Sequence, residues 1–185
     1  MIEITDAAVV LGSTQDPSVV APGIPFVRRR SGGGAVLVEP GGLVWVDVLV
    51  PATDRLWEGD VGRAFAWLGA TWNGALTDVG VRGGQVHGGP LATTPWSPLV
   101  CFAGVGPGEV TLDGAKVVGM AQRRTRAGAL FQSAALLDWC PDRLLDRLAL
   151  TDDDRRRGAE ELAEVARAVA VAPDALVAAL IDRLP

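Results

Sequence analysis

The sequence has few of the side chains that build covalent cross-links or metal centres. Its 185 residues include two cysteines, Cys101 and Cys140, and one histidine, His87. Two cysteines cannot form the disulfide framework that holds many small secreted domains together. With a single histidine, they also cannot supply the four ligands of a standard structural zinc site. We therefore expect neither a disulfide scaffold nor a metal site.

Positive charge is scarce as well. The formal net charge is −5 and the isoelectric point is near 4.9, whereas a nucleic-acid-binding domain usually carries a basic surface. No apolar run reaches the ~18 residues that a transmembrane helix needs. Residues 1–4 lack the basic and apolar regions of a signal peptide. These absences predict a cytoplasmic protein with no nucleic-acid partner and no membrane partner.

Lysine is the rarest charged residue. Lysine and arginine together number 17, and Lys116 is the only lysine. A compact ammonium and a planar guanidinium differ in shape and in how readily they lose a proton. A lysine that survives in a chain otherwise supplied with arginine suggests a task that arginine cannot do. Chance survival is the alternative, and the count alone does not choose between them.

Apolar residues make up 49% of the chain, which is enough for the core of one domain. The first part of the chain has short β-branched runs bordered by glycine or proline, the pattern of strands in a sheet. We expect strands at residues 7–12, 24–29, 35–38, 43–50, 85–87 and 99–103.

Two local signals are stronger. Residues 60–79 repeat apolar side chains at three- and four-residue steps, which predicts a helix with Asp60 as N-cap and Gly80 at its end. Asp113 and Gly114 form a hairpin signal between two apolar runs. This turn places Lys116 near the start of the strand that follows.

The last part of the chain is expected to be helical. Proline opens the segments at residues 141 and 173, and Thr151 precedes a third helix that we expect to reach residue 170. The predicted class is α+β, with a mixed, largely antiparallel sheet packed with helices and a short helical C-terminal tail. We expect a catalytic domain at residues 1–140 and a small helical extension at residues 141–185.

Two segments carry residues suited to chemistry. Residues 28–34 read RRRSGGG, and residues 116–123 read KVVGMAQR. Three consecutive glycines let backbone and ligand approach closely because no Cβ intervenes. Adjacent arginines can pair with a carboxylate or a phosphate. Taken singly, the first segment is also compatible with an exposed turn, and the second with an ordinary hairpin.

Together and in this order, the two segments resemble lipoate–protein ligases. That family carries an arginine-arginine-x-serine-glycine-glycine-glycine motif, followed later by a lysine-x-x-glycine-x-alanine motif. Upstream, residues 9–15, VVLGSTQ, resemble the family's strand-glycine-x-x-glutamine segment. The resemblance spans residues 7–137.

The resemblance implies the fold of the biotin/lipoate protein ligase catalytic domain. It also implies attachment of a lipoyl or octanoyl group to a lysine of a carrier protein, either a lipoyl domain or a glycine-cleavage-H-type carrier. Lipoate or octanoate would be the substrate, and Lys116 would face the reacting carbonyl, where a fixed ammonium stabilises a developing oxyanion. By position, the residues expected to line the substrate pocket are Arg29, Ser31, Gly32, Gly33, Gly34, Gly119 and Ala121.

One branch of the family, the octanoyltransferases, uses a cysteine and no ATP. In some members a cysteine-phenylalanine pair lies shortly before the lysine motif, as Cys101 and Phe102 do here. A thiolate near a positive charge can form an acyl thioester, so Cys101 is the second candidate catalytic residue. The alternative is that Cys101 is only a small hydrophobic residue in a strand.

The sequence departs from the family pattern at two places. Residues 38–42 read VEPGG where members often have histidine-aspartate-x-glycine-asparagine, and Gln132 and Ser133 stand where a histidine-glycine pair is frequent. Three functions stay open: an acyltransferase or ligase, a catalytically silent relative that binds an acyl ligand or carrier protein, and a biotin–protein ligase. The last ranks third because its glycine-arginine-glycine-arginine sequence is absent. The acyl donor also stays open, as free acid with ATP or as the thioester of an acyl carrier protein.

Overall fold

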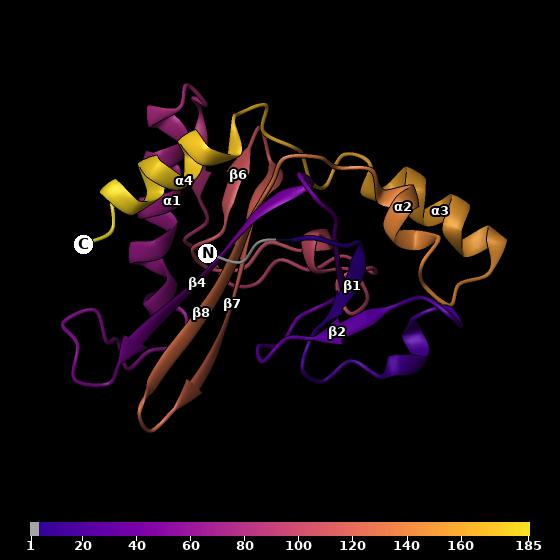
Figure 1. The fold of residues 1–185 in the computed structure, drawn as a ribbon, viewed down its shortest axis with the longest axis horizontal. Helices are drawn as coiled ribbons and strands as arrows, with labels where there is room; N and C mark the ends of the chain where they lie inside the picture. Colours follow the sequence, from indigo (N-terminus) through magenta and orange to yellow (C-terminus); the bar gives the residue numbers. More distant parts are fainter. Residues whose placement is uncertain (1–3) are drawn as a thin grey trace.

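The computed structural model describes residues 4–185 and confirms an α+β fold built on two sheets (Figure 1). Residues 1–3, part of the N-terminal segment assessed above, lie outside the described residues. The strands are β1 (Ala8–Leu11), β2 (Phe26–Arg28), β3 (Val36–Val38), β4 (Leu43–Pro51), β5 (Gly84–Val86), β6 (Val110–Leu112), β7 (Ala115–Thr125) and β8 (Gly128–Leu136). The helices are α1 (Ala66–Asp78), α2 (Pro141–Leu145), α3 (Asp152–Leu162) and α4 (Pro173–Asp182).

The larger sheet has five antiparallel strands in the order β4-β8-β7-β6-β5. The expected hairpin joins β6 to β7. Asp113 and Gly114 have φ values of 48° and 85°, and a two-residue turn with positive φ at both positions matches the twist of the flanking strands. Lys116 is therefore the second residue of β7, as the turn signal predicted.

The smaller sheet has the order β2-β1-β3. β1 pairs in parallel with β2 and antiparallel with β3, so this sheet is mixed. Its strands are only three or four residues long. The segment that links β2 to β3 holds the arginine- and glycine-rich motif, and the topology therefore places this motif at the end of β1.

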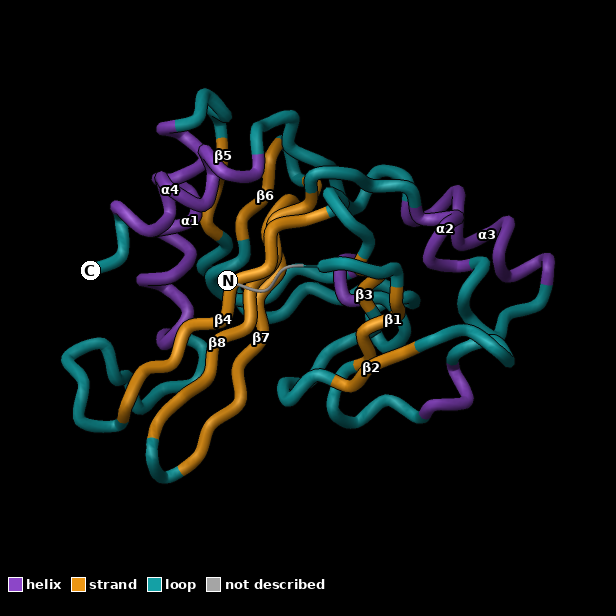
Figure 2. Tube along the Cα trace, in the orientation of Figure 1, coloured by secondary structure: helices purple, strands orange, loops and turns teal. Residues whose placement is uncertain are grey.

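Helices α1 and α4 lie side by side against the larger sheet, while α2 and α3 lie near the smaller one (Figures 1 and 2). Trp72 of α1 is fully buried, and its indole N–H donates to the Ser133 hydroxyl of β8 at 3.0 Å. Burial of each large apolar side chain in this layer contributes about 1.5–3 kcal/mol. α1 begins at Ala66 rather than at residue 61, because a 3₁₀ turn at Arg63–Phe65 comes first; the Asp60 carboxylate accepts from the Arg63 N–H at 2.8 Å, before this turn rather than before α1.

The expected helix at residues 152–170 is too long, since α3 ends at Leu162. The chain beyond it runs extended beside β7. The Lys116 N–H donates to the Val165 carbonyl and the Lys116 carbonyl accepts from the Arg167 N–H, both at 2.9 Å. Backbone pairing with the edge of β7 that faces away from β6 thus takes priority over continuing the helix. No helix within residues 4–185 is long and apolar enough to cross a membrane.

A group of buried side chains fills the seam between the two sheets. It joins Val10 and Val36 of the smaller sheet to Trp45 and Ala134 of the larger one, with Phe102 between them. The candidate functional residues gather along this seam.

Candidate functional site

The loop at residues 28–34 wraps around the side chain of Arg29. The guanidinium donates to the carbonyls of Gly32 (2.7 Å), Gly34 (2.8 Å) and Val10 (3.2 Å), and the residue is only 7% exposed. All of these acceptors are backbone oxygens. Arg29 therefore fixes the loop against β1 while keeping a positive charge inside the protein.

Two glycines let this loop lie directly on residues 100 and 101. A Cβ on Gly34 would stand 2.5 Å from the Val100 carbonyl carbon and 2.7 Å from the Cys101 nitrogen. Gly33 has a φ of 97°, and a Cβ there would stand 2.9 Å from a nitrogen of the Arg29 guanidinium. Both positions require glycine, one because of space and the other also because of backbone conformation.

Residues 99–103 are not a strand, so that prediction is wrong. A parallel bridge pairs Ala35 with Val100, and the Ala103 N–H then closes a turn onto the Val100 carbonyl at 3.2 Å, which makes Cys101–Ala103 a 3₁₀ turn. Val100 and Phe102 are buried, at 1% and 2% exposure, while Cys101 is partly exposed. Cys101 therefore lies in this turn at the edge of the core between the sheets, with its side chain partly exposed.

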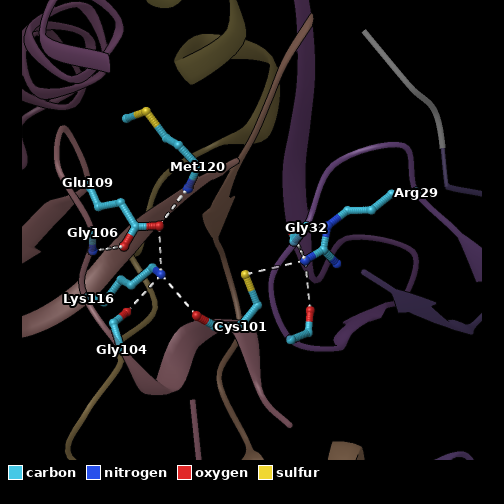
Figure 3. A network of polar contacts seen from close by, with 9 residues as sticks. Arg29, Gly32, Cys101, Gly104, Gly106, Glu109, Lys116 and Met120 are labelled. Atoms are coloured by element: carbon cyan, nitrogen blue, oxygen red, sulfur yellow. Dashed lines mark hydrogen bonds and ion pairs between the residues drawn. The ribbon is translucent and has the colours of Figure 1, made fainter. Parts of the chain in front are cut away.

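Lys116 is buried to 2% exposure and makes three polar contacts. Its Nζ lies 2.7 Å from Oε1 of Glu109, 2.9 Å from the Gly104 carbonyl and 3.0 Å from the Cys101 carbonyl (Figure 3). An ammonium has three N–H donors, and each has an acceptor here. Lys116 thus holds both ends of the 3₁₀ turn that carries Cys101.

Glu109 completes this buried pair; in the sequence it stands between Cys101 and Lys116, an order that resembles the octanoyltransferase arrangement, but it was not among the predicted site residues. Its carboxylate also accepts from the Met120 N–H at 2.8 Å and from the Gly106 N–H at 2.6 Å. An acidic residue just before β6 is the signal for it, because the hairpin brings β7 back beside β6, where Lys116 pairs with Thr111, two residues from Glu109.

Cys101 lies between the two cations, and each contacts a different part of it (Figure 3). Lys116 binds its carbonyl, whereas Nη2 of Arg29 lies 3.9 Å from its sulfur. Burial lowers the pKa of the Arg29 guanidinium, and interaction with the Cys101 sulfur acts in the opposite direction. The glycine-rich loop and the lysine hairpin, distant in sequence, therefore meet at Cys101.

Ser31 enters a second polar network. Its N–H and hydroxyl both donate to Oε1 of Gln132, at 3.2 and 2.9 Å. The Gln132 amide donates to the Asp47 carboxylate at 3.1 Å, and the Trp45 indole N–H donates to the same carboxylate at 2.7 Å. The sequence signal for Gln132 was the departure from the family pattern that the resemblance indicates at this position.

Two adjoining pockets open beside these residues. A small one is lined by Cys101, Arg29, Gly119 and Ala121, among others. A larger one, of about 350 Å³, has the aliphatic side chains of β1 and β3 and the Trp45 indole in its wall. Arg29, Trp45 and Gln132 belong to both linings.

The other predicted residues are not among the pocket-lining residues; each contacts a residue that is. Ser31 binds Gln132, Gly32 and Gly34 hold the Arg29 guanidinium, and a Cβ on Gly33 would lie 3.7 Å from the Cys101 sulfur. Within residues 4–185, no group of three or more His, Cys, Asp or Glu side chains is arranged to hold a metal ion.

Comparison with known proteins identifies a family and similar folds. A family model described as the lipoyl protein ligase A/B catalytic domain matches residues 1–176. No curated protein sequence matched the chain.

Several solved structures are similar in fold. One is the bipartite lipoate protein ligase of Thermoplasma acidophilum, studied with its E2 lipoyl domain, at 21% identity and a TM-score of 0.70. Others are a lipoate-protein ligase A bound with ATP (20%, 0.60) and P. falciparum LipL1 in complex with lipoate (14%, 0.60). Each match covers 96% of this chain, and respectively 66%, 67% and 44% of the other chain. At these identities the likeness shows the fold alone.

Proposed function

Because this chain belongs to the lipoyl protein ligase A/B catalytic domain family, we propose that it attaches a lipoyl or octanoyl group to a lysine of a small carrier domain. The proposed acceptor is a lipoyl domain or a glycine-cleavage-H-type protein. Between the two branches of the family, we favour transfer through a cysteine over ATP-dependent ligation.

The observation that carries this choice is the position of Cys101. Its thiol is partly exposed, lines a pocket with Gly119 and Ala121, and lies at the point where both sequence motifs meet. A buried thiol without a path to the pocket would instead have favoured the ligase branch. Partial exposure beside a cation is the environment in which cysteines are reactive.

Transfer then takes two steps. The Cys101 thiol first loses its proton to water, and the thiolate attacks the acyl carbonyl of a thioester donor. A carbon–sulfur bond forms to Cys101 as the donor's carbon–sulfur bond breaks, and the donor leaves as a thiol after taking a proton from water. The neutral amine of the carrier lysine next attacks the acyl-Cys101 thioester. An amide bond forms, the amine proton passes to water, and the Cys101 thiolate is released.

We assign the acyl chain to the larger pocket. Its volume of about 350 Å³ lies at the lower end of the ~300–1,000 Å³ typical of small-molecule sites. The wall contributed by Val10, Val38 and Trp45 is apolar, which suits a medium-length hydrocarbon. Arg29 and Gln132 stand where this pocket joins the smaller one beside Cys101, so the polar end of the chain would face the thiol.

The use of the loop arginines favours a thioester donor. Arg29 directs its N–H groups to backbone carbonyls, and Nη1 of Arg28 lies within 3.1 Å of the carbonyls of Gly12, Ser13 and Gln15. Guanidinium groups that bind a nucleotide phosphate need free N–H pairs. A neutral thioester, such as that of an acyl carrier protein, makes no such demand.

The oxyanion role of Lys116 stays a prediction. In this geometry Lys116 acts by fixing the carbonyl of the nucleophile, since its three N–H groups already have acceptors. The same observation favours the second candidate function, a member that binds an acyl ligand or carrier without transferring the group. An ammonium that cannot release one of these acceptors would not assist the reaction.

Intact-mass measurement separates the possibilities. A lipoyl domain is incubated with the protein and either octanoyl-acyl carrier protein or lipoate with ATP. We expect mass addition with the thioester, an octanoyl adduct on the enzyme, and loss of both in Cys101→Ser but not in Cys140→Ser. Modification that needs ATP and survives Cys101→Ser would assign a ligase. No modification with either donor would leave the binding function.

A further inference from the structure

The Arg29 guanidinium is a buried positive charge without a carboxylate partner among residues 4–185. It is 7% exposed, and its oxygen acceptors are the carbonyls of residues 10, 32 and 34. Arginine does not give up its proton in proteins. Carbonyl dipoles solvate the charge but do not neutralise it, and a buried charge without a counter-charge is costly. Among the described residues, no negatively charged side chain therefore neutralises the Arg29 guanidinium.

The ionisable atom that faces this guanidinium is the sulfur of Cys101, 3.9 Å from Nη2. Lys116 is differently placed. Its charge is matched by Glu109 at 2.7 Å, and its contact with Cys101 is to the carbonyl oxygen. The two cations thus differ in what they can do for the thiol: one faces it with an unmatched charge, and the other holds its backbone.

We propose that Arg29 is the charge partner of the Cys101 thiolate, and that Lys116 is a positioning residue for the turn that carries this thiol. The proposal rests on the proposed cysteine-dependent function. Deprotonation moves the thiol proton to water and leaves the electron pair on sulfur, opposite the guanidinium. When the acyl thioester forms, the sulfur becomes neutral and Arg29 again lacks an anion, so release of the thiolate in the second step restores the pair.

The loop geometry supports this pairing. Gly33 lies over both groups, since its missing Cβ would stand 2.9 Å from the guanidinium and 3.7 Å from the sulfur. A side chain here would cover the pair, whereas glycine leaves it open to a substrate. The guanidinium cannot move away from the sulfur without releasing the Gly32 and Gly34 carbonyls that it holds.

Other charged groups are placed less directly. In the small pocket that Cys101 lines, Arg29 is the one charged lining residue among those described. Asp47 lies behind Gln132, and Asp6 and Arg28 line the larger pocket beyond Arg29. The charges around the thiol, counted over every neighbouring element, are Arg29, the Lys116–Glu109 pair, Asp47, Asp6 and Arg28.

The test measures the alkylation rate of Cys101 against pH, without any acyl donor. It is done in Cys140→Ser, where Cys101 is the only thiol. The midpoint of the rise in rate with pH reports how readily the thiolate forms. Arg29→Gln should raise that midpoint and slow alkylation near neutral pH about tenfold, since one unit is a tenfold change in thiolate at low pH. Arg29→Lys, which keeps the charge, should restore part of the shift.

Two controls make the result specific. Arg28→Gln removes the same charge from the adjacent residue and should leave the midpoint nearly unchanged. Lys116→Met combined with Glu109→Gln removes both members of the neutral pair and should shift the midpoint less than Arg29→Gln does. If the double variant shifts it more, or if Arg29→Gln leaves it unchanged, the proposal is overturned.

A measurement that does not use an Arg29 variant covers the case in which Arg29→Gln does not fold. The chain contains no tyrosine, so its ultraviolet absorbance change with pH reports the thiolate without interference from tyrosinate. In Cys140→Ser, a midpoint above that of a free thiol would refute the pairing. These readouts are independent of acyl transfer: a thiolate that depends on Arg29 in a protein that transfers nothing would reject the proposed function alone. An acyl adduct on Cys101 with alkylation unaffected by Arg29→Gln would reject the pairing alone.

Discussion

Removing both members of the buried Lys116–Glu109 pair should destabilise the protein less than the sum of the two single removals. The two groups lie 2.7 Å apart at side-chain exposures of 2% and 5%. At an effective dielectric constant of about 20, their attraction amounts to about 6 kcal/mol before desolvation is subtracted. Lys116→Met leaves the Glu109 carboxylate buried with only two N–H donors, and it leaves the Cys101 and Gly104 carbonyls without the donor that they have now.

The expected cost of Lys116→Met or Glu109→Gln alone is about 3–5 kcal/mol, the usual result of leaving one buried charge unpaired. The double variant has no unpaired charge, so its cost should fall short of the sum of the single changes by about 0.5–3 kcal/mol or more. For a chain of this length, 1 kcal/mol corresponds to about 2–4 °C in melting temperature. Each single variant should therefore melt about 6–20 °C lower.

Urea denaturation of the four proteins, at constant pH and salt, measures these differences through the midpoint and the slope. Equal slopes would show that the compactness of the states is unchanged. The reasoning fails if each single variant costs less than about 1 kcal/mol, or if the double variant costs the sum of the two.

Three other predictions address the site and the tail. Lys116→Arg should abolish acyl transfer even if the variant folds, because a planar fork does not fit three acceptors arranged around a single nitrogen; full activity in the mass assay would contradict this. Gly33→Ala should lower the free energy of unfolding by about 1–3 kcal/mol more than Gly41→Ala, as measured by urea denaturation. Both glycines have positive φ (97° and 74°), but only at Gly33 would the added Cβ stand 2.9 Å from a guanidinium nitrogen. Equal costs would show that the loop can move to accept the methyl group. The hydrogen bond from Arg183 lowers the pKa of Asp78, so the contact between α4 and α1 is strongest above the unperturbed value of 3.8 and weakens as pH falls through the lowered pKa. Arg183→Gln should therefore lower the urea midpoint near neutral pH, and the difference from the unchanged protein should shrink on acidification. A difference that grows in acid would contradict a lowered pKa for Asp78.

Local signals in the sequence predicted the elements that depend on neighbouring residues. The Asp113-Gly114 turn was confirmed because positive φ at two successive positions is a property of those residues. For the same reason α1 ends close to the predicted position: its last residue is Asp78, and Gly80 just beyond it has a φ of 92°. The boundaries that were missed depended on distant partners. α3 stops early because residues 165 and 167 pair with Lys116, and residues 101–103 form a turn because Val100 pairs with Ala35.

The sequence by itself determined the fold class and the family, since two motifs in the right order restrict the backbone strongly, and both are confirmed by the fold and the family match. It also indicated that Lys116 is special, which its burial and three contacts support. The tertiary structure alone decided how the charges are distributed. Glu109 neutralises the lysine while Arg29 stays unmatched beside the Cys101 sulfur. Such an arrangement depends on distances of a few ångströms between segments about 70 residues apart, and electrostatic energy changes steeply at that range.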